Sequence, residues 1–310
     1  MKAITRFRPW PPASLRTGAL LTLLLIFPLR AAAQQPMSTE DELYSFVLGI
    51  EGKSHDDRGA FIKAQLQKSG VGYFTTPFTT TSVKRGDTTI ITGENIIATV
   101  GHGRKKIVVG AHYDAVPGSP GANDNGSGVA VLLELAKSLK EKEWRYSVDF
   151  CFFDREEDGL FGSSNYIERF SNRMTHLAMI NLDVEGTGQE VYVGPTGEGD
   201  DNLILPIVRR AAEFTKFPFK EREYFPDSDY ESFARVRLEN ISISIVPTGD
   251  ADKLSEMAKN GMKADPDKMP KVLRVMHTPN DRSTEVTPGA LRMSFEFTRE
   301  VLTLLNDSRR

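Results

Sequence analysis

The most informative stretch for the fold is Lys105-Lys106-Ile107-Val108-Val109-Gly110-Ala111-His112. After two lysines it runs without a polar side chain until it ends in a histidine. A strand without polar alternation is typical of a sheet that is covered on both faces. Runs of the same character follow at residues 148–153, 178–182 and 241–246. Together they predict a central sheet whose strands are mostly parallel.

Helical patterns separate these strands. Residues 129–139 place apolar side chains at every third or fourth position, which is one stripe of a helix. The order strand, helix, strand implies a parallel pair joined by a crossover. Further helical patterns at residues 201–216 and 288–305 would complete the layers. We predict an α/β fold, a three-layer sandwich with a mixed, mostly parallel central sheet and helices on both faces.

Three other segments carry weaker patterns. Residues 41–70 have helical spacing. Residues 73–100 alternate around a turn at 84–87, which predicts antiparallel strands near a sheet edge. Residues 250–275 are polar, Lys-rich and interrupted by prolines, which predicts a long surface loop that overhangs the strand ends.

The first 33 residues have the order of a secretory signal peptide. Basic residues precede an apolar run at 19–27, and the small residues Ala31-Ala32-Ala33 follow. The run is shorter than the roughly 20 apolar residues that a membrane-spanning helix needs. We expect cleavage, with an uncleaved anchor as the alternative. The predicted organisation is a signal peptide over 1–33 and one catalytic domain over 34–310, secreted or periplasmic and free of the membrane after cleavage.

Charge and cysteine content exclude several functions. Loss of residues 1–33 removes five basic residues and no acidic one, so the formal net charge moves from −3 to −8. A surface this acidic argues against nucleic acid and anionic membranes as partners. The one cysteine, Cys151, lies inside an apolar run. It predicts a buried, inert thiol and no intramolecular disulfide.

Acidic and imidazole side chains follow the ends of the apolar strands. In open α/β sheets the ligand site lies outside the carboxyl ends of the strands, so side chains far apart in sequence converge there. Any one of them alone is better explained as a solvated loop residue, and Asp124 alone as a helix N-cap. Their joint placement indicates a site. The set is His112, Asp124, Glu156, Glu157, Asp183 and His277.

This set matches the needs of two zinc ions. Zinc binds imidazole and carboxylate ligands, and two ions can share one carboxylate and one water. We predict His112 and Asp183 on one ion, Glu157 and His277 on the other, and Asp124 as the bridge. A water between two cations ionises near neutral pH and becomes the nucleophile.

Two further carboxylates receive roles around the metals. Glu156 neighbours the ligand Glu157, so its side chain points elsewhere, toward the shared water. We predict Glu156 as the general base that passes the water's proton to the leaving amine. Asp114, two residues after His112, is predicted to orient that imidazole. No role is assigned to the other histidines, which are His55, His102 and His176.

Five motifs carry a resemblance to a known family. They are His112-Tyr113-Asp114, Gly121-Ala122-Asn123-Asp124-Asn125-Gly126-Ser127-Gly128, Phe153-Asp154-Arg155-Glu156-Glu157-Asp158-Gly159-Leu160-Phe161-Gly162-Ser163, Asn181-Leu182-Asp183 and His277-Thr278-Pro279-Asn280-Asp281. They resemble the signatures of the co-catalytic dizinc aminopeptidases, a family with secreted bacterial leucyl aminopeptidases, glutamate carboxypeptidases, glutaminyl cyclases and the catalytically silent transferrin receptor. The similarity spans roughly residues 56–305. It implies the same ligand and base roles and a cis peptide after Asp124.

The chain departs from the family pattern in two places. Ser228-Asp229-Tyr230 resembles a Ser-Asp-His segment, with Tyr230 in place of the usual histidine. Met276 stands where some relatives place a tyrosine that stabilises the oxyanion. The oxyanion donor is therefore unassigned, with Tyr230 and Tyr224 as candidates.

The leading prediction is a secreted or periplasmic dizinc exopeptidase that removes N-terminal residues from peptides with a free N-terminus. A glutaminyl-peptide cyclase with one zinc is an alternative, and so is a carboxypeptidase, although those relatives usually carry extra domains. A binding protein like the transferrin receptor would have lost ligands or base, and none is lost here.

Overall fold

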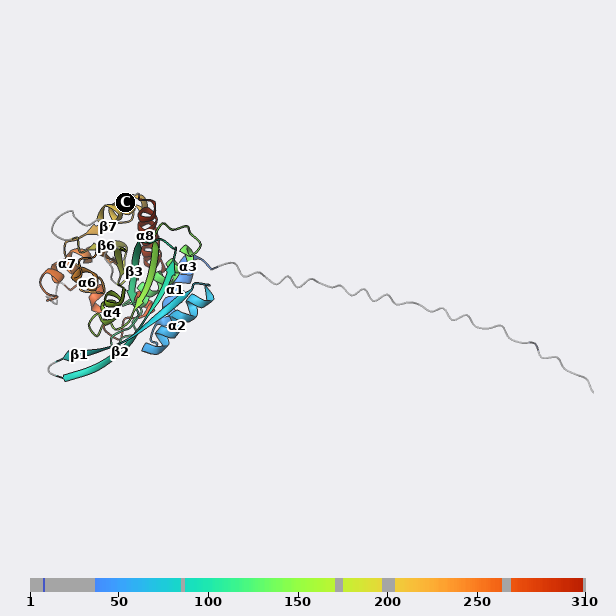
Figure 1. Cartoon of the computed structure of the whole chain (residues 1–310), viewed down its shortest axis with the longest axis horizontal. Helices are drawn as coiled ribbons and strands as arrows, with labels where there is room; N and C mark the ends of the chain where they lie inside the picture. Colours follow the sequence, from blue (N-terminus) through green and yellow to red (C-terminus); the bar gives the residue numbers. More distant parts are fainter. Residues whose placement is uncertain are drawn as a thin grey trace, which may run out of the picture. The chain divides into compact units, whose positions relative to one another are not determined.

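The computed structural model describes residues 8, 37–84, 87–170, 175–196, 204–263 and 269–308 (Figure 1). Residues Met37–Arg310 form one compact unit. Apart from Arg8, the predicted signal peptide lies outside the described residues and stays a prediction. Within the described ranges, no helix combines the length and the apolar character that crossing a membrane requires.

A mixed sheet forms the centre of this unit. The described strands follow the order β1-β2-β4-β3-β5-β8-β6-β7. The central pairs β3 with β4, β3 with β5, and β5 with β8 are parallel, whereas β1 with β2, β2 with β4, and β6 with β8 are antiparallel. The strands are β1 Tyr73–Lys84, β2 Asp87–Val100, β3 Lys106–His112, β4 Ser147–Phe153, β5 His176–Leu182, β6 Glu190–Gly194, β7 Phe219–Glu221 and β8 Asn240–Val246.

Helices cover both faces of the sheet, as predicted. The helices α1, α3, α5 and α8 pack against one another over one face, and α4 packs against α6 on the other. Side chains of β4 alternate between the two cores, with Phe152 in the first and Phe153 in the second. This double burial explains the uninterrupted apolar strands. The helices are α1 Thr39–Ile50, α2 His55–Lys68, α3 Gly126–Leu139, α4 Phe161–Phe170, α5 Leu205–Thr215, α6 Tyr230–Arg235, α7 Asp250–Lys259 and α8 Pro288–Asp307.

The structure refines one sequence prediction and corrects another. The helical stretch 41–70 is two helices, because Gly52 turns the chain at φ 67° and Ser54 caps the second helix by accepting a hydrogen bond from the Asp57 amide. The predicted loop 250–275 was wrong over its first part, which is α7. Its Lys-rich composition hides a short apolar stripe, and Ala251, Leu254 and Met257 of that stripe are buried.

The remaining local predictions agree with the structure. Strands β1 and β2 form the predicted antiparallel pair, and β1 is an edge strand. Cys151 is fully buried with a free thiol, and burial raises the pKa of that thiol well above its usual value. The thiol is therefore protonated and shielded, as expected of an inert cysteine.

Candidate metal centre

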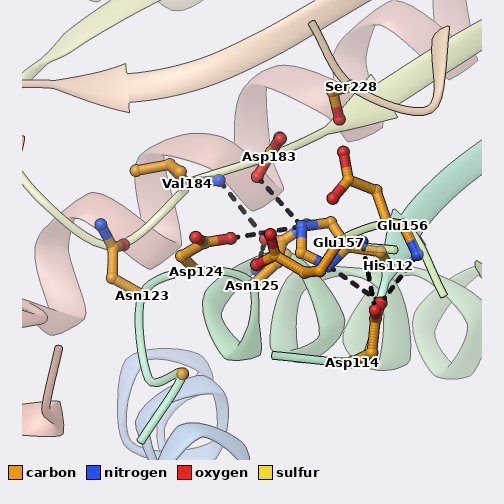
Figure 2. Close-up of polar contacts among 12 residues, drawn as sticks. His112, Asp114, Asn123, Asp124, Asn125, Glu156, Glu157, Asp183, Val184 and Ser228 are labelled. Carbon is orange, nitrogen blue, oxygen red and sulfur yellow. Dashed lines mark hydrogen bonds and ion pairs between the residues drawn. The ribbon is translucent and has the colours of Figure 1, made fainter. Parts of the chain in front are cut away.

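The carboxyl ends of three neighbouring parallel strands bring the predicted residues together. Strand β3 ends at His112, which pairs in register with Phe153, and Glu156 and Glu157 follow that residue. Asp183 directly follows β5. Asp124 comes from the loop before α3, and His277 follows the 3-10 turn Val272–Arg274. The structure thus places all six residues at one rim of the sheet. Figure 2 labels five of them, which are His112, Asp124, Glu156, Glu157 and Asp183.

The side chains form two triads that share Asp124. In the first, the Nε2 atom of His112 lies 3.2 Å from Asp124 Oδ1 and 3.6 Å from Asp183 Oδ1. In the second, the Nε2 atom of His277 lies 2.9 Å from Asp124 Oδ2 and 3.3 Å from Glu157 Oε2. Each oxygen of the Asp124 carboxylate therefore faces a different imidazole.

These spacings fit zinc ligation. Ligands at 2.0–2.2 Å from a tetrahedral ion stand about 3.3–3.6 Å apart, close to the four distances between 2.9 and 3.6 Å. Buried oxygens of Glu157 and Asp183 also lack a hydrogen-bond partner within the described chain. Donor atoms of His112, Glu156 and Glu157 form a third group with compatible spacing. The assignment of ligands therefore stays a prediction, although the donor chemistry fits.

The carboxylates and the two imidazoles of the site shift one another's pKa values. Hydrogen bonds that His277 donates to Asp124 and Glu157 raise its pKa to about 10. Burial lowers the pKa of His112, but the surrounding carboxylates outweigh it and raise the value well above normal. Burial of Asp124 is likewise outweighed by the two imidazoles, which lower its pKa. The protonated form of each imidazole is therefore favoured, because its positive charge offsets the surrounding carboxylates.

Glu156, the predicted base, and Asp114, the predicted orienting residue, lie beside the two triads. Burial raises the pKa of Glu156 well above its usual value, and the negative charge of Asp229 adds to the effect. The Oδ1 atom of Asp114 lies 3.4 Å from Nδ1 of His112, an ion-pair distance. The sequence did not reveal its second contact: the two Asp114 oxygens accept the amides of Glu156 at 3.1 Å and Glu157 at 3.2 Å. The Asp114 carboxylate therefore contacts His112 and also the backbone amides of Glu156 and Glu157.

Sequence reasoning missed two residues that hold Asp124. The buried Asp281 carboxylate accepts the amides of Asn123 at 2.8 Å and Asp124 at 3.1 Å. Arg58, which is 1% exposed, donates to four backbone carbonyls that precede Asp124 in the chain. They belong to Ile50, Tyr113, Pro120 and Gly121. Asp281 lies in the last quoted motif, whereas nothing local marks Arg58.

The residue that caps the N-terminus of α3 differs from the candidate Asp124. The N-cap is Asn125, whose side chain accepts the Gly128 amide at 3.1 Å, and not Asp124. The same Asn125 oxygen lies 3.3 Å from the Val184 amide (Figure 2). The Asp124–Asn125 peptide is cis, as the resemblance implied. Because Asn125 caps the helix, the Asp124 carboxylate is free of that role and faces both imidazoles.

A cavity of about 550 Å³ opens onto the triads. One wall is apolar and includes Tyr192, Phe225 and Met276. Among the described residues that line it, neither oxyanion candidate appears. The Tyr230 hydroxyl is turned away and donates to the Phe225 carbonyl at 3.1 Å, and Tyr224 carries Lys259 over its ring.

Comparison with known proteins agrees with this geometry. The model of peptidase family M28 matches residues 95–302, a segment that contains every predicted ligand and the predicted base. The chain belongs to peptidase family M28. Within this family of peptidases, the chain is 38% identical over 140 residues to aminopeptidase YwaD of Bacillus subtilis, covering 43% of this chain and 30% of that protein.

A second curated relative of this M28 chain also carries the name of an aminopeptidase. It is 31% identical over 192 residues to the probable lipoprotein aminopeptidase LpqL of Mycobacterium tuberculosis, covering 55% of this chain and 36% of LpqL. The chain thus spans about a third of the length of the curated relatives it matches.

Solved structures show the fold of the M28 chain. BSAP, a zinc aminopeptidase from Bacillus subtilis, aligns with a TM-score of 0.69 at 18% identity, over 87% of this chain and 95% of that one. Porphyromonas gingivalis glutaminyl cyclase aligns with a TM-score of 0.65 at 21% identity, over 85% and 97%. The mixed α/β architecture predicted from the sequence is therefore confirmed.

Proposed function

We propose that this M28 chain is a dizinc aminopeptidase that removes apolar N-terminal residues from peptides. The observation that carries the proposal is the orientation of Asp124, which turns one carboxylate oxygen to His112 and the other to His277. A single zinc ion would need only one of these imidazole and carboxylate triads. Aminopeptidases among the relatives support the reaction class.

The proposed ligands are His112 and Asp183 for one ion, His277 and Glu157 for the other, and Asp124 for both. Zinc at these positions would polarise the scissile carbonyl and favour ionisation of the attacking water. Asp281 and Asp114 contribute by fixing backbone amides of the ligand loops. These contacts would help to orient the ligand side chains of Asp124 and Glu157.

Glu156 is proposed to move the proton. Its carboxylate accepts a proton from the attacking water while the water oxygen bonds to the carbonyl carbon. It then gives that proton to the amine nitrogen as the C–N bond breaks, which releases the N-terminal amino acid. The raised pKa of Glu156 in its buried position suits a group that must both accept and return a proton.

The cavity wall supports a preference for apolar side chains. Tyr192 stacks on Phe225 with ring centroids 4.5 Å apart, and Val246, Leu254 and Val272 extend this surface. A wall of this kind binds a leucyl or phenylalanyl side chain better than a charged one. The predicted signal peptide supports action outside the inner membrane, where peptides with free N-termini are the proposed substrates.

Metal analysis combined with amino acid release tests the proposal. We expect two zinc equivalents per chain and chelator-sensitive cleavage of leucyl p-nitroanilide in preference to lysyl p-nitroanilide. Glu156→Gln should retain zinc and lose about 10²–10⁴ in kcat. Glu157→Gln, an identical change one residue along on the same Asp114 anchor, should lose zinc.

Other outcomes would redirect the assignment. Equal zinc loss in both variants would show that base and ligand were interchanged. One zinc equivalent without release would contradict the aminopeptidase and lead to a cyclisation assay with glutaminyl peptides. A protein that binds no zinc would refute the proposal altogether.

A further inference from the structure

A second cavity lies behind the segment that carries Glu156 and Glu157. It has a volume of about 350 Å³ and includes His55, Tyr113 and Asp154 among its lining residues. His55 is the first residue of α2, which contacts β2 (Figure 1). Neither the metal site nor the proposed reaction accounts for this histidine.

His55 binds a carboxylate that begins the catalytic segment. Its Nε2 atom lies 2.7 Å from Oδ1 of Asp154, whose side chain is fully buried. Its Nδ1 atom lies 3.1 Å from Asp56, and its ring stacks on Tyr113. The contact with Asp154 raises the pKa of His55, as expected for an imidazolium paired with a buried carboxylate.

Asp154 is held from three directions. Its Oδ2 atom accepts the Glu94 amide at 2.8 Å, and its own amide donates to Asn95 at 3.1 Å. Asn95 also donates to the carbonyl of Gly162 at 2.9 Å, so strand β2 forms hydrogen bonds with both ends of residues 154–162. Among these contacts, His55 supplies the one that comes from outside the sheet.

The segment that follows needs such a restraint. Arg155 has φ 59° and Leu160 has φ 60°, left-handed values that are uncommon for residues other than glycine and cost conformational energy. Glu156 stands directly after the first of these residues. A loss of the Asp154 anchor would let Arg155 relax toward ordinary backbone angles, and the Glu156 carboxylate would shift with it.

We propose that His55 is a positioning residue, which holds Glu156 in its catalytic position through the His55–Asp154 contact at the wall of the second cavity. The kinetic part of this inference rests on the proposed function, whereas the structural part does not. Among the other charged groups that line the cavity, Lys63 pairs with Glu94 and Arg155 pairs with Asp158. Asp56 also pairs with His55, but its side chain is 99% exposed. His55 therefore has Asp154 as its buried partner.

The test compares His55→Ala with His102→Ala, an exposed histidine beyond β2. In the zinc-loaded enzyme we expect His55→Ala to lower kcat about tenfold with KM within about twofold, because displacement of a catalytic group mainly affects the chemical step. Zinc content should not change. His55→Gln, which retains an N–H donor, should recover most of the loss, and His102→Ala should behave as wild type.

A double-mutant cycle separates positioning from a general structural defect. If His55 acts through Glu156, His55→Ala should lower kcat by less than about twofold in a Glu156→Gln background. An unreduced tenfold effect in that background would overturn the inference. An unchanged kcat in His55→Ala alone would overturn it as well.

Hydrogen exchange tests the same inference without any activity. The amides of Glu156, Glu157, Gly159, Leu160 and Phe161 all donate hydrogen bonds within or beside the segment. We expect them to exchange faster in His55→Ala, with or without zinc, and to be unaffected in His102→Ala. Unchanged exchange would refute the positioning role. Faster exchange in a protein that releases no amino acid would instead refute the proposed function alone.

Discussion

Arg58 offers a demanding test of how the metal site is supported. Its guanidinium is almost completely buried and donates to the carbonyls of Tyr113, Ile50, Pro120 and Gly121. Replacement by methionine keeps much of the side-chain volume but removes every donor. Four carbonyls near the ligand loop, three of them in buried contacts, would then lose a charged partner.

The magnitude follows from two opposing contributions. A hydrogen bond from a charged donor contributes about 1.5–3 kcal/mol, and two of the four contacts are long, at 3.3 Å, so the lower part of that range applies. Against this, burial lowers the pKa of Arg58 from 12.5 to about 10, a cost of about 3 kcal/mol for keeping the charge inside. We expect Arg58→Met to lower the free energy of unfolding by about 3–5 kcal/mol, consistent with removal of one buried charged partner.

Urea unfolding followed by circular dichroism measures this change in zinc-free protein. The control is Arg235→Met, because Arg235 is 60% exposed and should alter stability by less than about 0.5 kcal/mol. Since Arg58 also holds the chain before Asp124, the variant should bind zinc less completely after reloading. A loss below about 1 kcal/mol together with full zinc content would refute the supporting role of Arg58.

Three further predictions concern charge, reactivity and specificity. In zinc-free protein the pKa values of His112 and His277 are raised, so their ion pairs stabilise the fold fully below pH 6.5. This stabilisation is lost as the pH rises, and for His277 it is lost as the pH passes its pKa of about 10. Zinc binding at pH 7 should therefore release protons, and calorimetric enthalpies that are equal in phosphate and Tris buffers would contradict this. The Cys151 thiol should react with a disulfide reagent only after unfolding, because it is buried and its pKa is raised; rapid reaction of native protein would disprove its burial. Met276→Glu should lower kcat/KM for leucyl relative to lysyl p-nitroanilide by at least about tenfold, since a charge would enter the apolar wall; an unchanged ratio would place the specificity pocket elsewhere.

Strand character and strand ends were predictable because they are local properties. The apolar run that ends at His112 is buried on both faces, as its lack of alternation indicated. The position of Asp183 directly after an apolar run likewise placed it at the rim of the sheet. Local composition failed for residues 250–259, where three buried apolar positions outweigh the surrounding lysines and make a helix.

The α/β architecture could be predicted from the sequence, as could a set of candidate ligands at the strand ends, because hydrophobic periodicity and residue type act over a few neighbouring positions. The tertiary structure was needed to show which oxygen of Asp124 faces which imidazole. It was also needed to find the contacts that Arg58, Asp281 and His55 make with the loops beside the site. These contacts join residues up to 158 positions apart in the chain. Their geometry depends on how whole strands and helices pack, and no local pattern encodes it.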